Sequence, residues 1–174
     1  MQGALASQAI IQKKWGNLEK AMELFKYQEK LCRKLKYLEG IANSLGAQAE
    51  VLRAWGKIEK ALILVKEQVR IYRQTESLFG LRSAIPFQAD ILQELGQFTE
   101  AIGLYTEWKK ISQKLGDIRG QCLALLSQSS LYGKMKNKSM QIKLTNEALK
   151  LANEHNLKSI KTIAVRILHP KIDR

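Results

Sequence analysis

Hydrophobic residues recur along almost the whole chain at spacings of three and four, in blocks separated by short polar stretches. In the block from residue 41 to residue 54 the apolar positions are Leu45, Ala49 and Leu52. These spacings place the apolar side chains on one face of an α-helix. A second block, residues 58–73, repeats the spacing, and Gly56 between the blocks suits the left-handed conformation that often follows a helix. The pattern predicts a hairpin of two amphipathic helices, closed by a polar stretch at residues 74–77.

The same pattern returns at one fixed period, from residue 5 to residue 151, without an insertion. The columns that carry it are turn glycines at Gly16, Gly56 and Gly96, small alanines at Ala21, Ala61 and Ala101, and amides at Gln8, Gln48, Gln88 and Gln128. Alanine at a helix contact lets two helix axes approach towards the short end of the roughly 8–10 Å packing range. Amides both donate and accept hydrogen bonds. The glutamine column therefore predicts a structural role, either as a hydrogen-bonded ladder along the first helices or as partners for backbone groups at helix ends. The alternative is a row of side chains that contacts a ligand.

The repeats divide the chain approximately into residues 1–40, 41–80, 81–120 and 121–156, followed by a helix and tail at residues 157–174. A single hairpin cannot bury its apolar stripe, so neighbouring hairpins must stack. The last segment has apolar residues at threes and fours and stops before Pro170, which predicts a capping or partial-repeat helix. A basic helix on a membrane surface and a partner-binding helix are the alternatives.

Two places depart from the repeat. In the fourth repeat, Lys136 stands in the turn-glycine column and Gln141 in the alanine column, which predicts a looser or differently angled hairpin. In the third repeat, Pro86 falls within the first helix, where an interior proline costs about 3 kcal/mol or more. We therefore expect this helix to begin late, near Ile85, rather than to kink.

The order of small and large positions resembles the tetratricopeptide repeat. Leu45, Ala49 and Leu52 match the first helix of that family, Ala61 and Val65 match its second helix, and Phe25 and Tyr105 match its aromatic position. The family's usual unit has about 34 residues. The period of 40 is similar to the long-helix variant of kinesin light chains and bacterial multidomain signalling proteins. The resemblance implies an all-α fold, a right-handed superhelix of antiparallel helix hairpins (an α-solenoid), which binds ligands in the groove lined by its first helices.

Charged residues of both signs occupy the columns that this resemblance places in the groove. They are Lys13, Lys14, Glu50, Arg53, Asp90 and Glu94. They predict a site for a peptide of mixed charge; the alternative is ordinary solvated helix faces, with surface ion pairs worth about 0–1 kcal/mol each. Some family members clamp a chaperone's terminal carboxylate, but Ile10 stands where the first clamp asparagine is expected, so we do not expect that activity.

Length and charge narrow the class of protein. The 174 residues, 45% of them hydrophobic, suit one compact domain or a short repeat array. No apolar run reaches the roughly 18 residues of a membrane span, and no secretory signal is visible, so we expect a cytoplasmic protein with no membrane partner. The net charge is +13, and residues 121–174 contain ten Lys or Arg against three Asp or Glu. The lysines at Lys134, Lys136, Lys138 and Lys143 would meet phosphates or form a solvated face.

Catalytic and metal-binding patterns are missing from the sequence. Cys32 and Cys122 have no metal or redox spacing and predict two partly buried thiols in a reducing compartment, with a single disulfide as the alternative. His155 and His169 lie far from both cysteines, so no zinc ligand set is expected. Glycines occur singly, without a phosphate-binding loop. We expect no cofactor, no metal and no enzymatic activity.

The predicted function is a non-catalytic scaffold that binds a protein, as a peptide or helix, on its concave face. A basic array that binds nucleic acid is one alternative. Oligomerisation through an uncapped first hairpin is another, since Met1 stands in an apolar column with no polar cap before it. The same observation makes a segment of a larger protein the expected context.

Overall fold

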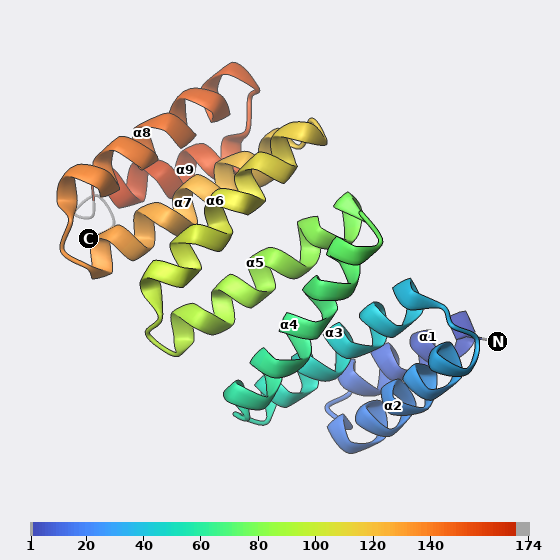
Figure 1. Cartoon of the computed structure of the whole chain (residues 1–174). Coiled ribbons are helices and arrows are strands. Elements are labelled where there is room, and N and C mark those ends of the chain that lie inside the picture. The colour runs from blue at the N-terminus through green and yellow to red at the C-terminus, as the bar shows by residue number, and fades with distance from the viewer. Residues whose placement is uncertain (1, 170–174) are drawn as a thin grey trace. The chain divides into compact units, whose positions relative to one another are not determined.

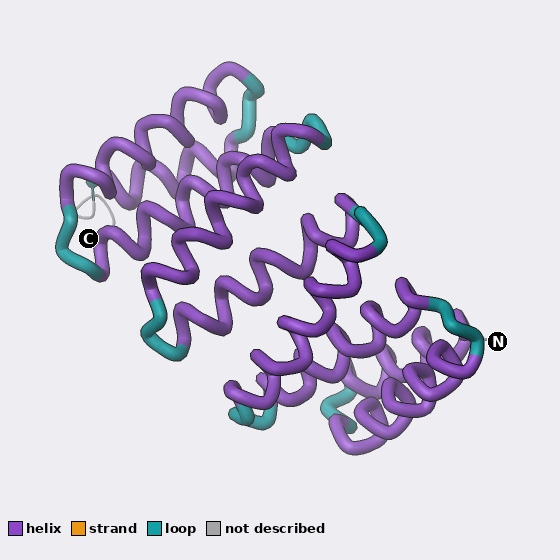
Figure 2. Tube along the Cα trace, in the orientation of Figure 1, coloured by secondary structure: helices purple, strands orange, loops and turns teal. Residues whose placement is uncertain are grey.

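The computed structural model describes residues 2–169, and within these residues it contains nine α-helices and no strand (Figures 1 and 2). The helices are α1 (Gln2–Lys14), α2 (Leu18–Lys34), α3 (Leu38–Ala54), α4 (Ile58–Gln74), α5 (Leu78–Glu94), α6 (Phe98–Lys114), α7 (Ile118–Lys134), α8 (Lys138–Glu154) and α9 (Lys158–Leu168). From α2 onwards the helices begin at a constant interval along the chain, so that two helices and their turns make up one sequence period. Met1, the residue in the predicted uncapped column, lies outside the described residues.

The chain forms two compact units, unit 1 (Met1–Leu95) and unit 2 (Gly96–Arg174). Unit 1 contains α1 to α5, and unit 2 contains α6 to α9. The division falls inside the segment 81–120, between its two helices. The repeat boundaries drawn from the sequence remain predictions, and each unit is described by itself below.

In unit 1 each helix packs against the next along the chain, from α1 to α5 (Figure 1). A core cluster at the first three helices contains Ala9, Ala21, Met22, Phe25 and Val51. The alanine columns are fully buried, which permits the close approach of helices that the sequence predicts. Burial of a large apolar side chain of this kind stabilises the fold by about 1.5–3 kcal/mol.

In unit 2, α9 packs on α8 and also contacts α7, and the shared core includes Leu125, Ala148, Ile160 and Ala164. The predicted ninth helix is therefore present, and it ends at Leu168, before Pro170. The fourth hairpin is not looser, because α7 and α8 pack against each other as extensively as α3 and α4 do. A different angle between its helices stays a prediction. Small residues at the contact maintain this packing even though Gln141 replaces the usual alanine, since Ala148 and Ala152 are fully buried.

Every connection between helices is a three-residue turn whose middle residue is left-handed. The predicted turn glycines have positive φ, at 81° for Gly16, 71° for Gly56 and 75° for Gly96. Lys136 occupies the same conformation, with φ of 60°, and Asn137 N donates to the carbonyl of Tyr132 at 2.9 Å. This hydrogen bond closes the helix end in the same way as at the glycine turns. The backbone thus keeps one turn geometry even where the glycine is lost.

The first helix of the third repeat differs from the sequence-based expectation. The expected late start near Ile85 is wrong, since α5 begins at Leu78 and contains Pro86 in its interior. Ser77 caps the helix, because its Oγ accepts a hydrogen bond from Gly80 N at 3.3 Å. The helix also packs on α4. This capping and packing outweigh the local cost of the proline.

Candidate functional site

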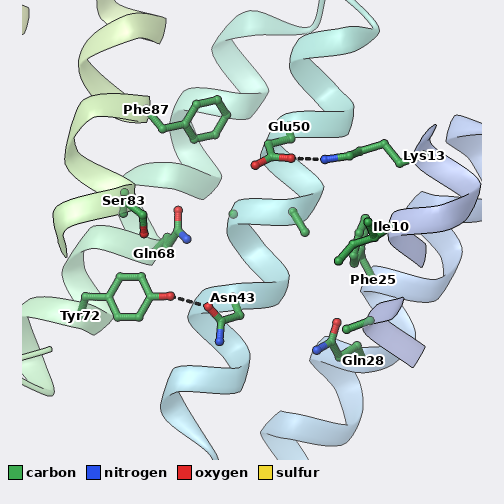
Figure 3. Close-up of a pocket in the computed structure, with 14 residues that line it drawn as sticks. Ile10, Lys13, Phe25, Gln28, Asn43, Glu50, Gln68, Tyr72, Ser83 and Phe87 are labelled. Atoms are coloured by element: carbon green, nitrogen blue, oxygen red, sulfur yellow. Dashed lines mark hydrogen bonds and ion pairs between the residues drawn. The ribbon is translucent and has the colours of Figure 1, made fainter. Parts of the chain in front are cut away.

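The candidate site is a groove of about 530 Å³ in unit 1 to which all five helices contribute (Figure 3). Its lining residues are Ala6, Ile10, Lys13, Phe25, Gln28, Asn43, Gly46, Ala47, Glu50, Gln68, Tyr72, Ser83, Ala84 and Phe87. The lining combines uncharged polar side chains, apolar side chains and one pair of oppositely charged side chains. Such a combination is typical of pockets that bind organic ligands or peptides. We call it the unit 1 groove.

A tyrosine and an asparagine form the polar contact at one end of the unit 1 groove. Tyr72 Oη donates a hydrogen bond to Asn43 Oδ1 at 2.6 Å, which joins α4 to α3 (Figure 3). Burial raises the pKa of the Tyr72 phenol, so the group stays protonated at neutral pH and can hold this donor role. The pair fixes the position of the Asn43 amide beside the groove.

Gln68 provides an unusual acceptor in the same groove. Its side chain is 7% exposed, and its Oε1 is buried without a hydrogen-bond partner. A buried carbonyl oxygen without a partner costs about 1–3 kcal/mol. A Cβ at Gly46 would lie 2.2 Å from Gln68 Nε2, so only glycine at that position leaves room for the amide in its present place. Figure 3 shows the oxygen of Gln68 on the side of the amide that is nearer Phe87.

Two ion pairs join first helices at the rim of the groove. Lys13 on α1 pairs with Glu50 on α3, and Arg53 on α3 pairs with Glu94 on α5. The Arg53 guanidinium also lies 5.6 Å from the centre of the Phe87 ring. A second hollow lined by Glu50, Arg53, Ala54, Phe87 and Glu94 shares two residues with the groove and extends it. The rim side chains are between 29% and 49% exposed, so solvent and ligands can reach these charges.

Of the six charged residues predicted from the sequence, the structure brings only four together at the groove and its extension. Lys13, Glu50, Arg53 and Glu94 line the groove or its extension. Lys14 is exposed, and Asp90 is half-buried on α5; neither lines these two hollows. Their role in binding a ligand stays a prediction for all six.

The glutamine column does not form a ladder of amides in the described residues. Gln48 Nε2 donates to Glu29 Oε2 on the preceding helix α2 at 2.7 Å, and Gln128 Nε2 donates to Thr106 Oγ1 on α6 at 2.8 Å. These two glutamines therefore join a first helix to the second helix before it. Gln88 is buried as well, whereas Gln8 is exposed.

Several groove residues were missed by the sequence reading. The sequence gives no motif that marks Gln28 or Phe87 as part of a site, and Gln68 stands where the tetratricopeptide family usually has a small residue. The signal available was that Gln28 and Gln68 occupy the same column in consecutive repeats, on an otherwise apolar face. A buried amide on such a face requires a partner or a function. The Cβ clearance at Gly46 and the missing partner of Gln68 needed the structure.

Unit 2 has a hollow of about 520 Å³ between α7, α8 and α9, here called the unit 2 groove. Its lining residues are Ser130, Gly133, Lys134, Lys138, Gln141, Ile142, Arg166, Ile167 and Leu168. Three of these are cationic and none is acidic. Lys134 Nζ also lies 5.9 Å from the centre of the Phe98 ring, which places its charge beside an aromatic face.

Cys32 and Cys122 are both free thiols, so they do not form the alternative disulfide, and they are fully buried rather than partly buried. Burial raises the pKa of each thiol. Among residues 2–169 no group of three His, Cys, Asp or Glu side chains is placed to hold a metal ion. No helix in this part of the chain is long and apolar enough to cross a membrane.

Solved structures resemble this chain over nearly its whole length. A Signal Transduction ATPase with Numerous Domains (STAND) protein with a tetratricopeptide repeat sensor, from Pyrococcus horikoshii, matches 96% of the chain at 24% identity and a TM-score of 0.83. Aspartyl phosphate phosphatase F from Bacillus subtilis matches 96% at 7% identity and a TM-score of 0.84. BtubC (BKLC) from P. vanneervenii matches 94% at 16% identity and a TM-score of 0.78. The fold is a tetratricopeptide-like helical repeat.

This likeness confirms the all-α solenoid expected from the sequence, and at these identities it concerns the fold alone. The chain spans 25% of the STAND protein and 45% of the phosphatase, but 73% of BtubC. No protein-family model and no curated protein matches the sequence.

Proposed function

We propose that the unit 1 groove binds an extended peptide segment of a protein partner, with charged side chains of both signs. The observation that carries the proposal is Gln68, which lines the groove and whose buried Oε1 has no hydrogen-bond partner. If the Gln68 amide turns so that this oxygen faces the groove, an N–H donor from a ligand satisfies it and recovers the free energy that its isolation costs. An extended peptide carries such a donor on almost every residue.

The rest of the groove supports a peptide rather than a small apolar ligand. The amides of Gln28 and Asn43 can contact backbone groups of a peptide, since each amide both donates and accepts. Ile10 is 44% exposed and, with Phe87, provides an apolar surface for a side chain of the peptide. The groove therefore offers separate contacts for the backbone and the side chains of one segment.

The rim charges support a ligand of mixed charge. Exposed ion pairs such as those of Lys13 and Arg53 contribute about 0–1 kcal/mol. A peptide can exchange them for its own charges at little cost, with its acids facing Lys13 and Arg53 and its bases facing Glu50 and Glu94. Charge complementarity of this kind selects partners and raises association rates more than it adds affinity.

Selection of peptides from a random displayed library tests the proposal, with binding then measured by calorimetry on the whole chain. We expect Arg53→Glu to weaken the selected peptides by about tenfold or more, because each tenfold corresponds to about 1.4 kcal/mol. Arg70→Glu is the matched control, because Arg70 lies in an exposed ion pair with Glu67 and does not line the groove. Peptides that bind Arg53→Glu and Gln68→Met as tightly as the parent chain would contradict the proposal.

A second candidate is the binding of an anionic polymer such as nucleic acid, which the cationic lining of the unit 2 groove favours. Lysine and arginine side chains supply most of the affinity for a phosphate backbone, and this affinity falls steeply with salt. Affinity for a labelled polyanion, measured on variants of each groove in turn, tests this candidate.

A further inference from the structure

A smaller hollow adjoins the unit 1 groove, and α3, α4 and α5 all contribute to it. It has a volume of about 270 Å³ and shares Asn43, Tyr72 and Ser83 with the groove. The other residues that line it are Glu39, Ser77, Phe79 and Gly80. We call it the Glu39 pocket. The shared residues include the hydrogen-bonded pair of Tyr72 and Asn43 (Figure 3), so a peptide that reaches this end of the groove can place one side chain in the pocket.

The polar groups that the pocket offers to a ligand are mainly acceptors. Ser83 Oγ donates its proton to the carbonyl of Gly80 at 2.9 Å, and Tyr72 Oη donates its proton to Asn43 Oδ1. Lone pairs of both hydroxyl oxygens remain for a ligand. The carboxylate of Glu39 adds further acceptors, because it is exposed and forms no ion pair with the residues that the structure describes. A ligand group with several N–H donors suits this lining.

The charge of the pocket favours a cation. Glu39 is the one charged side chain among the described residues that line it. Glu39 lies in the first turn of α3, where the helix dipole stabilises the ionised carboxylate. The start of α5 attracts anions less, because Ser77 Oγ already accepts a hydrogen bond from Gly80 N at 3.3 Å. An anionic ligand would therefore be repelled by Glu39, whereas a cationic ligand would form an ion pair with it.

An aromatic ring gives the pocket a surface for a flat cation. Phe79 is 71% exposed, and its ring centre lies 5.9 Å from the guanidinium of Arg82. This contact shows that a guanidinium reaches a favourable distance from the ring. Most of the Phe79 surface stays exposed despite the contact, so a second planar group can stack there. Arginine combines a planar cation with five N–H donors, whereas the lysine ammonium is a compact point charge.

We propose that the Glu39 pocket binds an arginine side chain of the peptide that occupies the unit 1 groove. The guanidinium forms an ion pair with Glu39 and stacks on Phe79, and its remaining N–H groups donate to the hydroxyl oxygens of Ser83 and Tyr72. The arginine thereby fixes which part of the peptide lies beside the pair of Tyr72 and Asn43. This inference rests on the proposed function, because it requires a peptide in the groove.

The probes for the test are peptides selected on the whole chain from a random displayed library. We expect the selected peptides to share an arginine at one position. Citrulline in its place keeps the planar shape and removes the charge. Calorimetry on the parent chain should show about fivefold weaker binding of the citrulline peptide, because a partly exposed ion pair is lost. On Glu39→Gln the arginine and citrulline peptides should differ by less than about twofold.

Two further variants give the result its specificity. Glu59→Gln is the matched control, because Glu59 is also an exposed glutamate in the first turn of a helix, α4, and does not line the pocket. It should keep the roughly fivefold difference between the two peptides. Phe79→Ala should weaken the arginine peptide by about two- to fivefold, the range of an exposed cation–π contact. Circular dichroism checks that each variant is folded, which we expect because Glu39, Glu59 and Phe79 are all exposed.

The arginine site is overturned if citrulline weakens binding equally on the parent chain and on Glu39→Gln, or if the selected peptides share no arginine. When such peptides still lose affinity for Arg53→Glu, the proposed function of the groove stands and only the role of the Glu39 pocket fails. When no peptide binds the chain, the proposed function fails, and the arginine site fails with it.

Discussion

The two units use the same helical repeat to line grooves of different electrostatic character. In unit 1 the cations Lys13 and Arg53 are each paired with a glutamate of a neighbouring first helix. In unit 2 the described residues that line the groove include Lys134, Lys138 and Arg166, and none of them is acidic. The difference arises within repeat columns, since Ser130 of the fourth repeat stands in the column that Glu50 occupies in the second. A repeat fold thus keeps its backbone while single column positions set the chemistry of each groove.

The largest expected effect is a loss of affinity for a polyanion when the cations of the unit 2 groove are replaced, but not when those of the unit 1 groove are. A labelled oligothymidylate should bind the chain, and the combined change Lys134→Glu, Lys138→Glu and Arg166→Glu should abolish binding. Three phosphate contacts predict a fall in affinity of roughly twentyfold between 50 and 200 mM salt. Fluorescence anisotropy at several salt concentrations measures both effects. The control, Lys13→Glu with Arg53→Glu in unit 1, should change the affinity much less, and an equal loss would contradict the assignment to unit 2.

The next largest effect is a difference in stability between alanine substitutions at two glycines within helices. A Cβ at Gly80 would lie 2.2 Å from Cδ1 of the Tyr72 ring, so Gly80→Ala should lower the free energy of unfolding by about 1–3 kcal/mol. A Cβ at Gly133 would meet the end of the flexible Gln141 side chain, at 2.6 Å from Nε2. Gly133→Ala should therefore change stability by less than about 0.5 kcal/mol, because Gln141 can move and alanine favours the helix. Urea denaturation of both variants, followed by circular dichroism, measures the difference; equal losses would show that the Tyr72 contact is not the cause.

Substitutions at the turns should change the free energy of unfolding by a smaller amount, and in opposite directions in the two units. Gly56 has φ of 71° with nothing within 4 Å of a Cβ placed there, so Gly56→Ala should cost about 1 kcal/mol through backbone conformation alone. Lys136 holds a similar conformation, with φ of 60°. Lys136→Gly should stabilise the chain by up to about 1 kcal/mol. Thermal unfolding of both variants checks the signs, and a loss of stability in Lys136→Gly would indicate that its side chain has a stabilising contact.

The smallest effect on stability is expected from ion pairs between alternate helices. Glu50→Gln removes the pair with Lys13 in unit 1, and Glu147→Gln removes the pair with Lys109 in unit 2. Each change should alter the free energy of unfolding by about 0–1 kcal/mol, because the side chains are partly exposed. Only Glu50→Gln should weaken peptides selected on the unit 1 groove. A loss of peptide binding in Glu147→Gln as well would remove this distinction between the units.

The fold was predictable because its causes are local and repeated. Apolar spacings of three and four define each helix, and a left-handed residue follows its end at regular intervals along the chain. The turns at Lys36, Glu76 and Asn156 were less visible, because residues other than glycine hold the left-handed conformation there. The start of α5 was predicted incorrectly, because the local cost of Pro86 is outweighed by the Ser77 cap and by packing on α4.

The candidate site was predictable only in part. The columns indicated which charges face the groove, and four of the six line it or its extension. Which charged side chains form ion pairs with each other depends on the distances between the helices that carry them. The pairing of Lys13 with Glu50, far apart in the sequence, follows from the packing of the hairpins and from no feature of the local sequence.

Most helices, the glycine turns and the small-residue columns follow from the sequence alone, because they depend on backbone conformation and on the period of apolar side chains. Three features follow from the packing of the helices instead: Gln48 reaches Glu29, Gln68 has a buried oxygen beside Gly46, and Ile11 is exposed where Val51 is buried. The physical reason is that hydrogen bonding and burial depend on which atoms lie next to one another in space. Identical residues in one column therefore acquire different environments once the hairpins are packed.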